Sequence, residues 1–128
     1  MKKYWLLALI GLVFTACQES LEERCARDAK EYTRKHCPAV MDSHTIIDSL
    51  TFEKETHTIH YYYRLTDVDN EEEVLNKIDA INLLKQTLKN TTAVKTYKDN
   101  KYRFAYTYRS GKDPKKILLE VVFTDKDY

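Results

Sequence analysis

The strongest constraint on the fold comes from two segments in which apolar or aromatic residues occupy every second position. Residues 58–66 read TIHYYYRLT, and residues 101–109 read KYRFAYTYR. Successive side chains of a β-strand point to opposite faces of a sheet, so this alternation predicts two strands that each bury one face. Residues 61–64 (YYYR) can be laid over residues 106–109 (YTYR), which hints at two related halves.

Two further segments alternate in the same way and complete a set of four predicted strands. Residues 45–54 direct one face inward, with Asp48 as an exception to the pattern, and that face comprises Ile46, Leu50 and Phe52. In residues 115–124, the side chains expected to point inward are those of Ile117, Leu119, Val121 and Phe123. The short segments 55–57 and 110–114 suit the turns before the second and fourth strands.

Helical periodicity predicts two helices, over residues 18–36 and 71–89. Ser20 with Glu23 forms a capping box for the first helix, and Asn70 with Glu73 forms one for the second. The apolar face of the second helix comprises Val74, Ile78, Ile81, Leu84 and Leu88, and Leu83 falls on the opposite side. Residues 91–100 are interpreted as a connector with room for a short strand at 93–97.

The order of these elements is helix, two strands, helix, two strands, which predicts the α+β class. We expect an αββαββ two-layer sandwich, in which a four-stranded antiparallel sheet carries both helices on one face. A chain of 128 residues with 43% hydrophobic residues suffices for one domain with one core.

The first sixteen residues, MKKYWLLALIGLVFTA, have the features of a signal peptide. Lys2 and Lys3 precede an apolar run of about ten residues, which is roughly half of what a bilayer-spanning helix needs. The next residues, Phe14-Thr15-Ala16-Cys17, resemble a bacterial lipobox. That resemblance implies cleavage before Cys17, lipidation of Cys17 and a single α+β domain, residues 17–128, anchored through it.

The same resemblance implies a location in the bacterial cell envelope. Gln18 follows the cysteine where an aspartate would tend to retain a lipoprotein at the inner membrane, and this favours the outer membrane. A multiply acylated cysteine anchors firmly, because each buried methylene contributes about 0.8 kcal/mol. The alternative is an ordinary secreted protein in which Cys17 is incidental.

A second resemblance covers most of the remaining chain. The succession Cys37-Pro38, Asp42, Thr45, Asp48-Ser49 and then Tyr61, Tyr63 and Leu65 is similar to a CP…D…T…DS…YxYxL pattern in small uncharacterised bacterial envelope proteins. The resemblance implies that a helix and then a Tyr-rich final hairpin follow this pattern. The proteins that share the pattern have no assigned activity.

The two cysteines after Cys17 are not expected to pair. Cys25 lies inside the first predicted helix and Cys37 lies at its end. Twelve helical residues rise about 18 Å, whereas the Cα atoms of a disulfide lie within about 7 Å of each other. A disulfide would require the helix to end early.

Several chemistries are disfavoured by composition and spacing. A net charge of +1 gives no nucleic-acid surface, and two Gly are too few for a phosphate-binding loop. The four histidines show no zinc spacing, so neither a metal nor a cofactor is expected. Cys37 with a nearby histidine is the one nucleophile–base set worth naming, and no oxyanion hole accompanies it.

The face of the sheet away from the helices is the candidate binding face. Tyr and Arg are enriched at binding hot spots, although Tyr and Thr also favour strands for their own sake. The face comprises His60, Tyr62, Arg64, Arg103, Thr107 and Arg109, with Leu118, Glu120 and Val122 beside them. It would suit an envelope protein, peptidoglycan or another glycan, or a second copy of the chain.

These features favour a lipid-anchored envelope protein that acts as a small interaction module of unknown ligand, and not as an enzyme. Its partners would be the membrane, through Cys17, and an envelope protein or glycan. One alternative is a small thiol enzyme that uses Cys37, and another is a structural or assembly accessory subunit. A carrier of a soluble ligand would need a concave pocket between helices and sheet, which elements this short are expected to fill.

Overall fold

The computed structural model of the protein describes residues 19–128, without the side chains of residues 77 and 78. The expected signal peptide, residues 1–16, and Cys17 lie outside the described residues. The elements are α2 (Leu21–His36), β1 (Ala39–Asp42), β2 (Thr45–Glu53), β3 (Thr58–Leu65), α3 (Glu71–Val74), α4 (Lys77–Asn90), α5 (Lys95–Asp99), β4 (Arg103–Arg109) and β5 (Ile117–Phe123).

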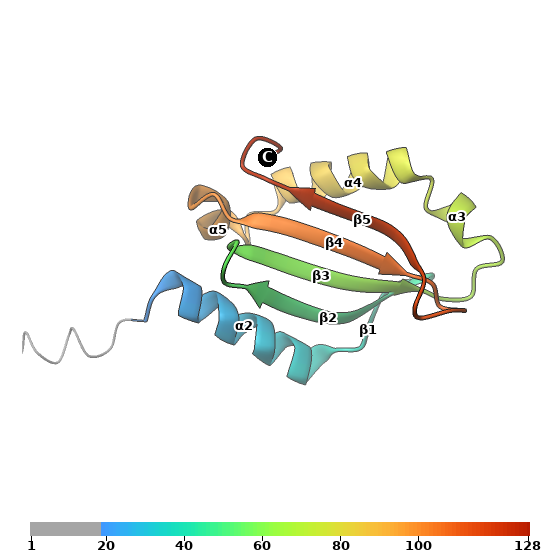
Figure 1. Ribbon diagram of the computed structural model, residues 1–128, viewed down its shortest axis with the longest axis horizontal. Helices are drawn as coiled ribbons and strands as arrows, with labels where there is room; N and C mark the ends of the chain where they lie inside the picture. Colours follow the sequence, from blue (N-terminus) through green and yellow to red (C-terminus); the bar gives the residue numbers. More distant parts are fainter. Residues whose placement is uncertain (1–18) are drawn as a thin grey trace, which may run out of the picture.

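The protein has the predicted α+β class, but its sheet differs from the expected one. The five strands lie in the order β1-β2-β3-β4-β5, and β3 pairs with β4 in parallel while the other pairs are antiparallel (Figure 1). The expectation of four antiparallel strands was therefore wrong twice. β1 is only four residues long, too short to show an alternation. The chain between β3 and β4 crosses over through α3, α4 and α5, so β4 runs in the direction of β3.

The two tyrosine-rich segments become direct neighbours in this parallel pair. Tyr61 lies opposite Tyr106, Tyr63 lies opposite Tyr108, and Arg64 lies opposite Arg109. The similarity of the two segments thus places like side chains side by side on each face of the sheet.

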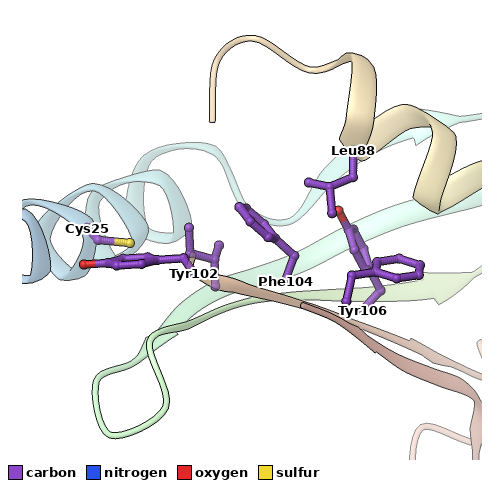
Figure 2. Packing of buried hydrophobic residues seen from close by; sticks show 7 residues of the cluster. Cys25, Leu88, Tyr102, Phe104 and Tyr106 are labelled. Carbon is purple, nitrogen blue, oxygen red and sulfur yellow. The ribbon is translucent and has the colours of Figure 1, made fainter. Parts of the chain in front are cut away.

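The long helices α2 and α4 both cover one face of the sheet, as predicted. Cys25 of α2 and Leu88 of α4 pack in one cluster against Phe104, which is completely buried (Figure 2). The backbone N–H of Glu23 donates to Ser20 Oγ at 3.1 Å, which confirms the predicted N-cap. We call the covered side of the sheet the helix face and the other side the open face.

The second predicted helix and the connector after it depart from expectation. The helix is interrupted at Asn76, whose backbone is not helical, so α3 and α4 replace one helix over 71–89. Val74, expected in the core, is 51% exposed, whereas Leu83 is exposed as predicted. The predicted strand at 93–97 is wrong, because α5 occupies residues 95–99.

Two β-bulges change which side chains of β2 and β5 point inward. The register of β2 shifts between Ile47 and Ser49, so Ile47 enters the core in place of Ile46. The register of β5 shifts beside Arg109, so Leu118 is buried and Ile117 is 48% exposed, the reverse of the prediction. A bulge inserts one extra residue, which exchanges inward and outward positions on one side of it.

The intact helix α2 separates Cys25 from Cys37, and both are free thiols, as the helical rise predicted. Within residues 19–128, no helix combines the length and the apolar character needed to cross a bilayer.

Candidate functional site

All six residues of the predicted binding face lie together on the open face. β3 and β4 each contribute three, namely His60, Tyr62, Arg64, Arg103, Thr107 and Arg109. Leu118, which the bulge buries, does not belong to this face. The parallel register places Tyr62 opposite Thr107 and Arg64 opposite Arg109.

The centre of the open face is a hydrogen-bonded chain of four side chains. Glu53 Oε1 lies 2.9 Å from His60 Nδ1, and His60 Nε2 lies 2.7 Å from Thr107 Oγ1. Thr107 Oγ1 in turn donates to Glu120 Oε2 at 3.3 Å. Thr107 is only 1% exposed and His60 is 9% exposed. These two side chains therefore hold the face together and present little surface to a partner.

The aromatic and basic side chains around this chain are also engaged. The Tyr62 ring stacks on His60 with centroids 4.0 Å apart, and its hydroxyl lies 3.2 Å from His60 Nδ1. Arg64 Nε donates to Asp48 Oδ1 at 2.8 Å, and Arg109 donates to the Pro114 carbonyl at 3.3 Å. The open face is thus an ordered platform in which most of these polar side chains already have partners, and the exposed Arg103 is the exception among the described residues.

The helix face carries a groove that sequence reasoning missed. It has a volume of about 470 Å³ and lies between the β1–β2 turn on one side and α3 with the start of α4 on the other. Leu65, Leu75 and Leu84 give it an apolar lining. Val74 and Leu83 also line it, and they are 51% and 69% exposed. Such exposed apolar side chains around a groove are typical of an interaction site.

The groove has an acidic rim. Asp42 from the end of β1 and Asp79 from α4 line it, and no Lys or Arg is among its described lining residues. His44 also lines it, with Nδ1 3.4 Å from the Thr66 carbonyl. The arrangement suits an apolar segment that carries positive charge beside it.

A row of tyrosines on the helix face leads into this groove. Ring centroids lie 4.9 Å apart for Tyr61 and Tyr106 and again for Tyr63 and Tyr108, which lines the groove. Among the described residues, none of these four hydroxyls has a hydrogen-bond partner. Burial raises the pKa of Tyr61 to about 12 and raises that of Tyr63 further. Burial and then the negative charge of Asp42 raise the pKa of Tyr108.

The surroundings of Cys37 disfavour thiol chemistry. Burial, followed by the negative charge of Asp48, raises the pKa of the Cys37 thiol, and burial raises that of Cys25 to about 11. A reactive cysteine needs the opposite, because the thiolate is the nucleophile. Among residues 19–128, no three His, Cys, Asp or Glu side chains gather in an arrangement that could hold a metal ion.

Comparison with known proteins identifies a family and solved structures of similar fold. Residues 20–119 match the model of a family described as Domain of unknown function (DUF8479). A search of curated proteins finds no match. A protein from Pseudomonas aeruginosa described as secreted superimposes with a TM-score of 0.67 at 13% identity, covering 86% of this chain and 98% of its own.

Two pilotins of type II secretion systems have the same fold. AspS from Vibrio cholerae superimposes with a TM-score of 0.58 at 14% identity, covering 84% of this chain and 92% of its own. EpsS from Vibrio vulnificus superimposes with a TM-score of 0.57 at 11% identity, covering 84% of this chain and 90% of its own. At these identities the likeness establishes the fold alone.

Proposed function

The chain belongs to the DUF8479 family, a family of unknown function, and we propose that it is a lipid-anchored interaction module of the bacterial cell envelope. Its role in this proposal is that of an accessory subunit that binds an envelope protein, without catalysis. The fold shared with two pilotins supports an accessory role in an envelope assembly.

The anchor in this proposal is lipid on Cys17, at the outer membrane. The lipobox-like residues 14–17 and Gln18 support it. Intact mass spectrometry of the native protein tests it directly, and the expected mass is that of residues 17–128 plus acyl chains. A protein that retains residues 1–16 or carries no acyl chain would remove the anchor from the proposal.

The groove on the helix face is the single observation that carries the interaction role. An apolar floor with exposed Val74 and Leu83 at its sides is open enough to take a segment of another protein. The rim carboxylates of Asp42 and Asp79 favour a partner segment that combines apolar side chains with basic ones.

The test is a comparison of two single substitutions in the full-length protein, purified from native membranes after cross-linking. Leu83→Glu places a charge in the groove, and Val122→Glu places the same charge on the open face, where Val122 is 48% exposed. We expect Leu83→Glu to abolish recovery of a stoichiometric protein partner and Val122→Glu to leave recovery unchanged. Both side chains are exposed, so neither substitution should lower the melting temperature.

The open face is a second candidate surface, because Arg103 is exposed and Tyr62, Arg64 and Arg109 are partly exposed there. Replacing Tyr62, Arg64 and Arg109 together tests it. Loss of the partner in this triple variant, with Leu83→Glu behaving as the parent, would move the site from the groove to the open face. Recovery of no protein by the parent would overturn the proposal of a protein partner and leave peptidoglycan or another glycan to be tested.

A further inference from the structure

The end of the molecule where α2 begins carries a hollow lined by lysines. It has a volume of about 600 Å³ and lies among the end of α4, α5 and the C-terminal residues. The charged residues that line it are Lys89, Lys95, Lys98, Lys101, Asp99 and Asp125.

Among the described residues, two of these lysines make side-chain contacts within the protein and two do not. Lys95 Nζ pairs with Asp99 Oδ2 at 2.7 Å, and Lys98 Nζ donates to the carbonyl of Leu88 at 2.8 Å, at the end of α4. No ion pair within the described residues engages Lys89 or Lys101. The side chains that line the hollow therefore carry an excess of positive charge, with Asp125 as the one side-chain carboxylate among them outside the Lys95 pair.

This hollow lies at the end of the domain to which the proposed anchor is attached. Tyr97 of α5 packs in the same cluster as Cys25 of α2, and Figure 1 shows α5 beside the first turns of α2. Ser20, the N-cap of α2, comes three residues after Cys17. Because an extended chain spans at most about 3.6 Å per residue, Ser20 lies within about 11 Å of a lipid-bearing Cys17.

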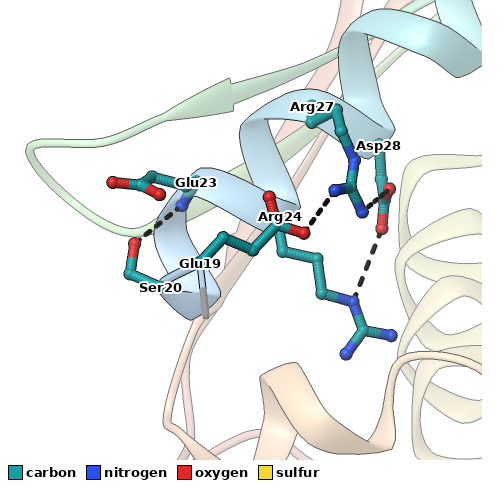
Figure 3. Close-up of polar contacts among 6 residues, drawn as sticks. All are labelled: Glu19, Ser20, Glu23, Arg24, Arg27 and Asp28. Carbon is teal, nitrogen blue, oxygen red and sulfur yellow. Dashed lines mark hydrogen bonds and ion pairs between the residues drawn. The ribbon is translucent and has the colours of Figure 1, made fainter. Parts of the chain in front are cut away.

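Most acidic side chains at the start of α2 do not cancel this charge, since they have partners of their own; Glu23 is the exception, with no ion pair within the described residues. Glu19 pairs with Arg27, and Asp28 pairs with both Arg24 and Arg27 (Figure 3). Glu22 pairs with His57 and lies 3.9 Å from Lys54 Nζ.

We propose that the lysine hollow binds the phosphate-bearing headgroups of anionic lipids, so that the α5 end of the domain rests on the bilayer. The inference builds on the proposed anchor, because a short tether would hold the lysines within a Debye length of the headgroups, about 8 Å in physiological salt, and would add to their own attraction for anionic lipid. The groove lies at the opposite end, beside α3, and this orientation turns it away from the membrane.

The test uses residues 17–128 with Cys17→Ser, a chain that keeps every described helix and strand and has no lipid. Co-sedimentation is measured with phosphatidylcholine vesicles that contain about 30 mol% phosphatidylglycerol and with phosphatidylcholine vesicles alone. We expect binding to the anionic vesicles alone, with loss of binding at high salt. Lys89→Gln combined with Lys101→Gln should weaken that binding about thirtyfold.

Lys115 supplies the matched control, because it is exposed in the β4–β5 turn at the other end. Lys115→Gln should leave vesicle binding within about twofold of the parent. Equal binding by the double variant and the parent, or equal binding to both kinds of vesicle, would overturn the inference. The intact mass of the native protein tests the anchor separately from the lysine site. If the native protein is acylated but its Cys17→Ser form does not bind anionic vesicles, the proposed anchor stands and the proposed lysine site is wrong.

Discussion

The two faces of the sheet come from the same alternating sequence but are stabilised in different ways. The helix face is held by packing: Phe104 is completely buried, and the rings of Tyr61, Tyr63 and Tyr106 stack in a row. Within residues 19–128 the open face has no helix over it, and it is held by the hydrogen-bonded chain through His60 and Thr107. On a sheet face that no helix covers, side chains of neighbouring strands must bury one another. The polar groups buried in this way need hydrogen-bond partners, and these hydrogen bonds then hold the side chains in place.

Tyr62 and Tyr63, adjacent in β3, show the difference on a small scale. The Tyr62 hydroxyl contacts His60 Nδ1, whereas the Tyr63 hydroxyl finds no partner among the described residues. The comparison predicts two ways to reduce the stability of the fold strongly. One is to remove side-chain volume from the helix face, and the other is to remove hydrogen-bonding groups from the open face.

The largest effect should come from Phe104→Ala on the helix face. Removing a completely buried ring leaves a cavity, and the free energy of unfolding should fall by about 3–5 kcal/mol. Val122→Ala on the open face, where the side chain is 48% exposed, should change it by less than about 0.5 kcal/mol. Urea unfolding measures both, and equal losses would contradict the contrast between the faces.

Alkaline pH should destabilise the protein through the helix face. The pKa of Tyr61 is raised by burial from 10.0 to about 12, so the folded state holds this proton more tightly than the unfolded state does. The stabilisation is complete below pH 10 and is lost as the pH rises towards about 12, an effect of about 2–3 kcal/mol for this residue. Urea unfolding from pH 9 upward, about one unit below the ordinary tyrosine pKa, checks it. Tyr61→Phe should flatten the decline, and an unchanged decline would exclude Tyr61 as a cause.

Thr107→Val should be the most damaging small change on the open face. It keeps the shape of the side chain but removes the hydroxyl between His60 Nε2 and Glu120, which leaves a buried nitrogen without its partner. We expect a loss of about 2 kcal/mol. Thr51→Val, at an exposed position opposite His60 in β2, should change stability by less than about 0.5 kcal/mol. A neutral Thr107→Val would show that packing alone holds the open face.

The smallest effects should still differ in order between adjacent tyrosines. Tyr62→Phe removes a hydrogen bond to His60 and should reduce stability by about 1 kcal/mol. Tyr63→Phe removes a hydroxyl without a described partner and should stay within about 0.5 kcal/mol of the parent, or stabilise it. Chemical denaturation at neutral pH measures the pair, and the reverse order would contradict the assignment of polar and apolar faces.

Local patterns in the sequence were sufficient to predict the four long strands, the helix α2 and its N-cap. The alternation in β3 and β4 identified both strands, and Ser20 marked the start of α2. Strand direction could not be predicted in this way, because an alternating strand has the same pattern in a parallel or an antiparallel pair. The inward position of Ile47 depends on a bulge, and the only signal for it was Asp48, the polar residue that interrupted the alternation.

Some features of the candidate site could likewise be predicted from the sequence and others could not. Membership of the open face follows from strand parity, so His60, Tyr62 and Thr107 could be placed from the sequence. The burial of His60 and Thr107 could not, because it arises from side chains of β2 and β5 that reach across the strands. The groove was missed for a related reason. It depends on the break at Asn76, which turns Val74 outward against a regular helical period.

The parallel pairing of β3 with β4 also affects the order in which the parts of the protein can fold. Its partners, beginning with Thr58 and Arg103, are separated by about 45 residues of chain. The hairpin of β2 and β3 can form early, but its tyrosine-rich edge stays unpaired until β4 has emerged, and such non-local pairing is slow. This late closure keeps the core open until the end of folding, and a chain that ends before Arg103 would expose a strand edge that favours aggregation.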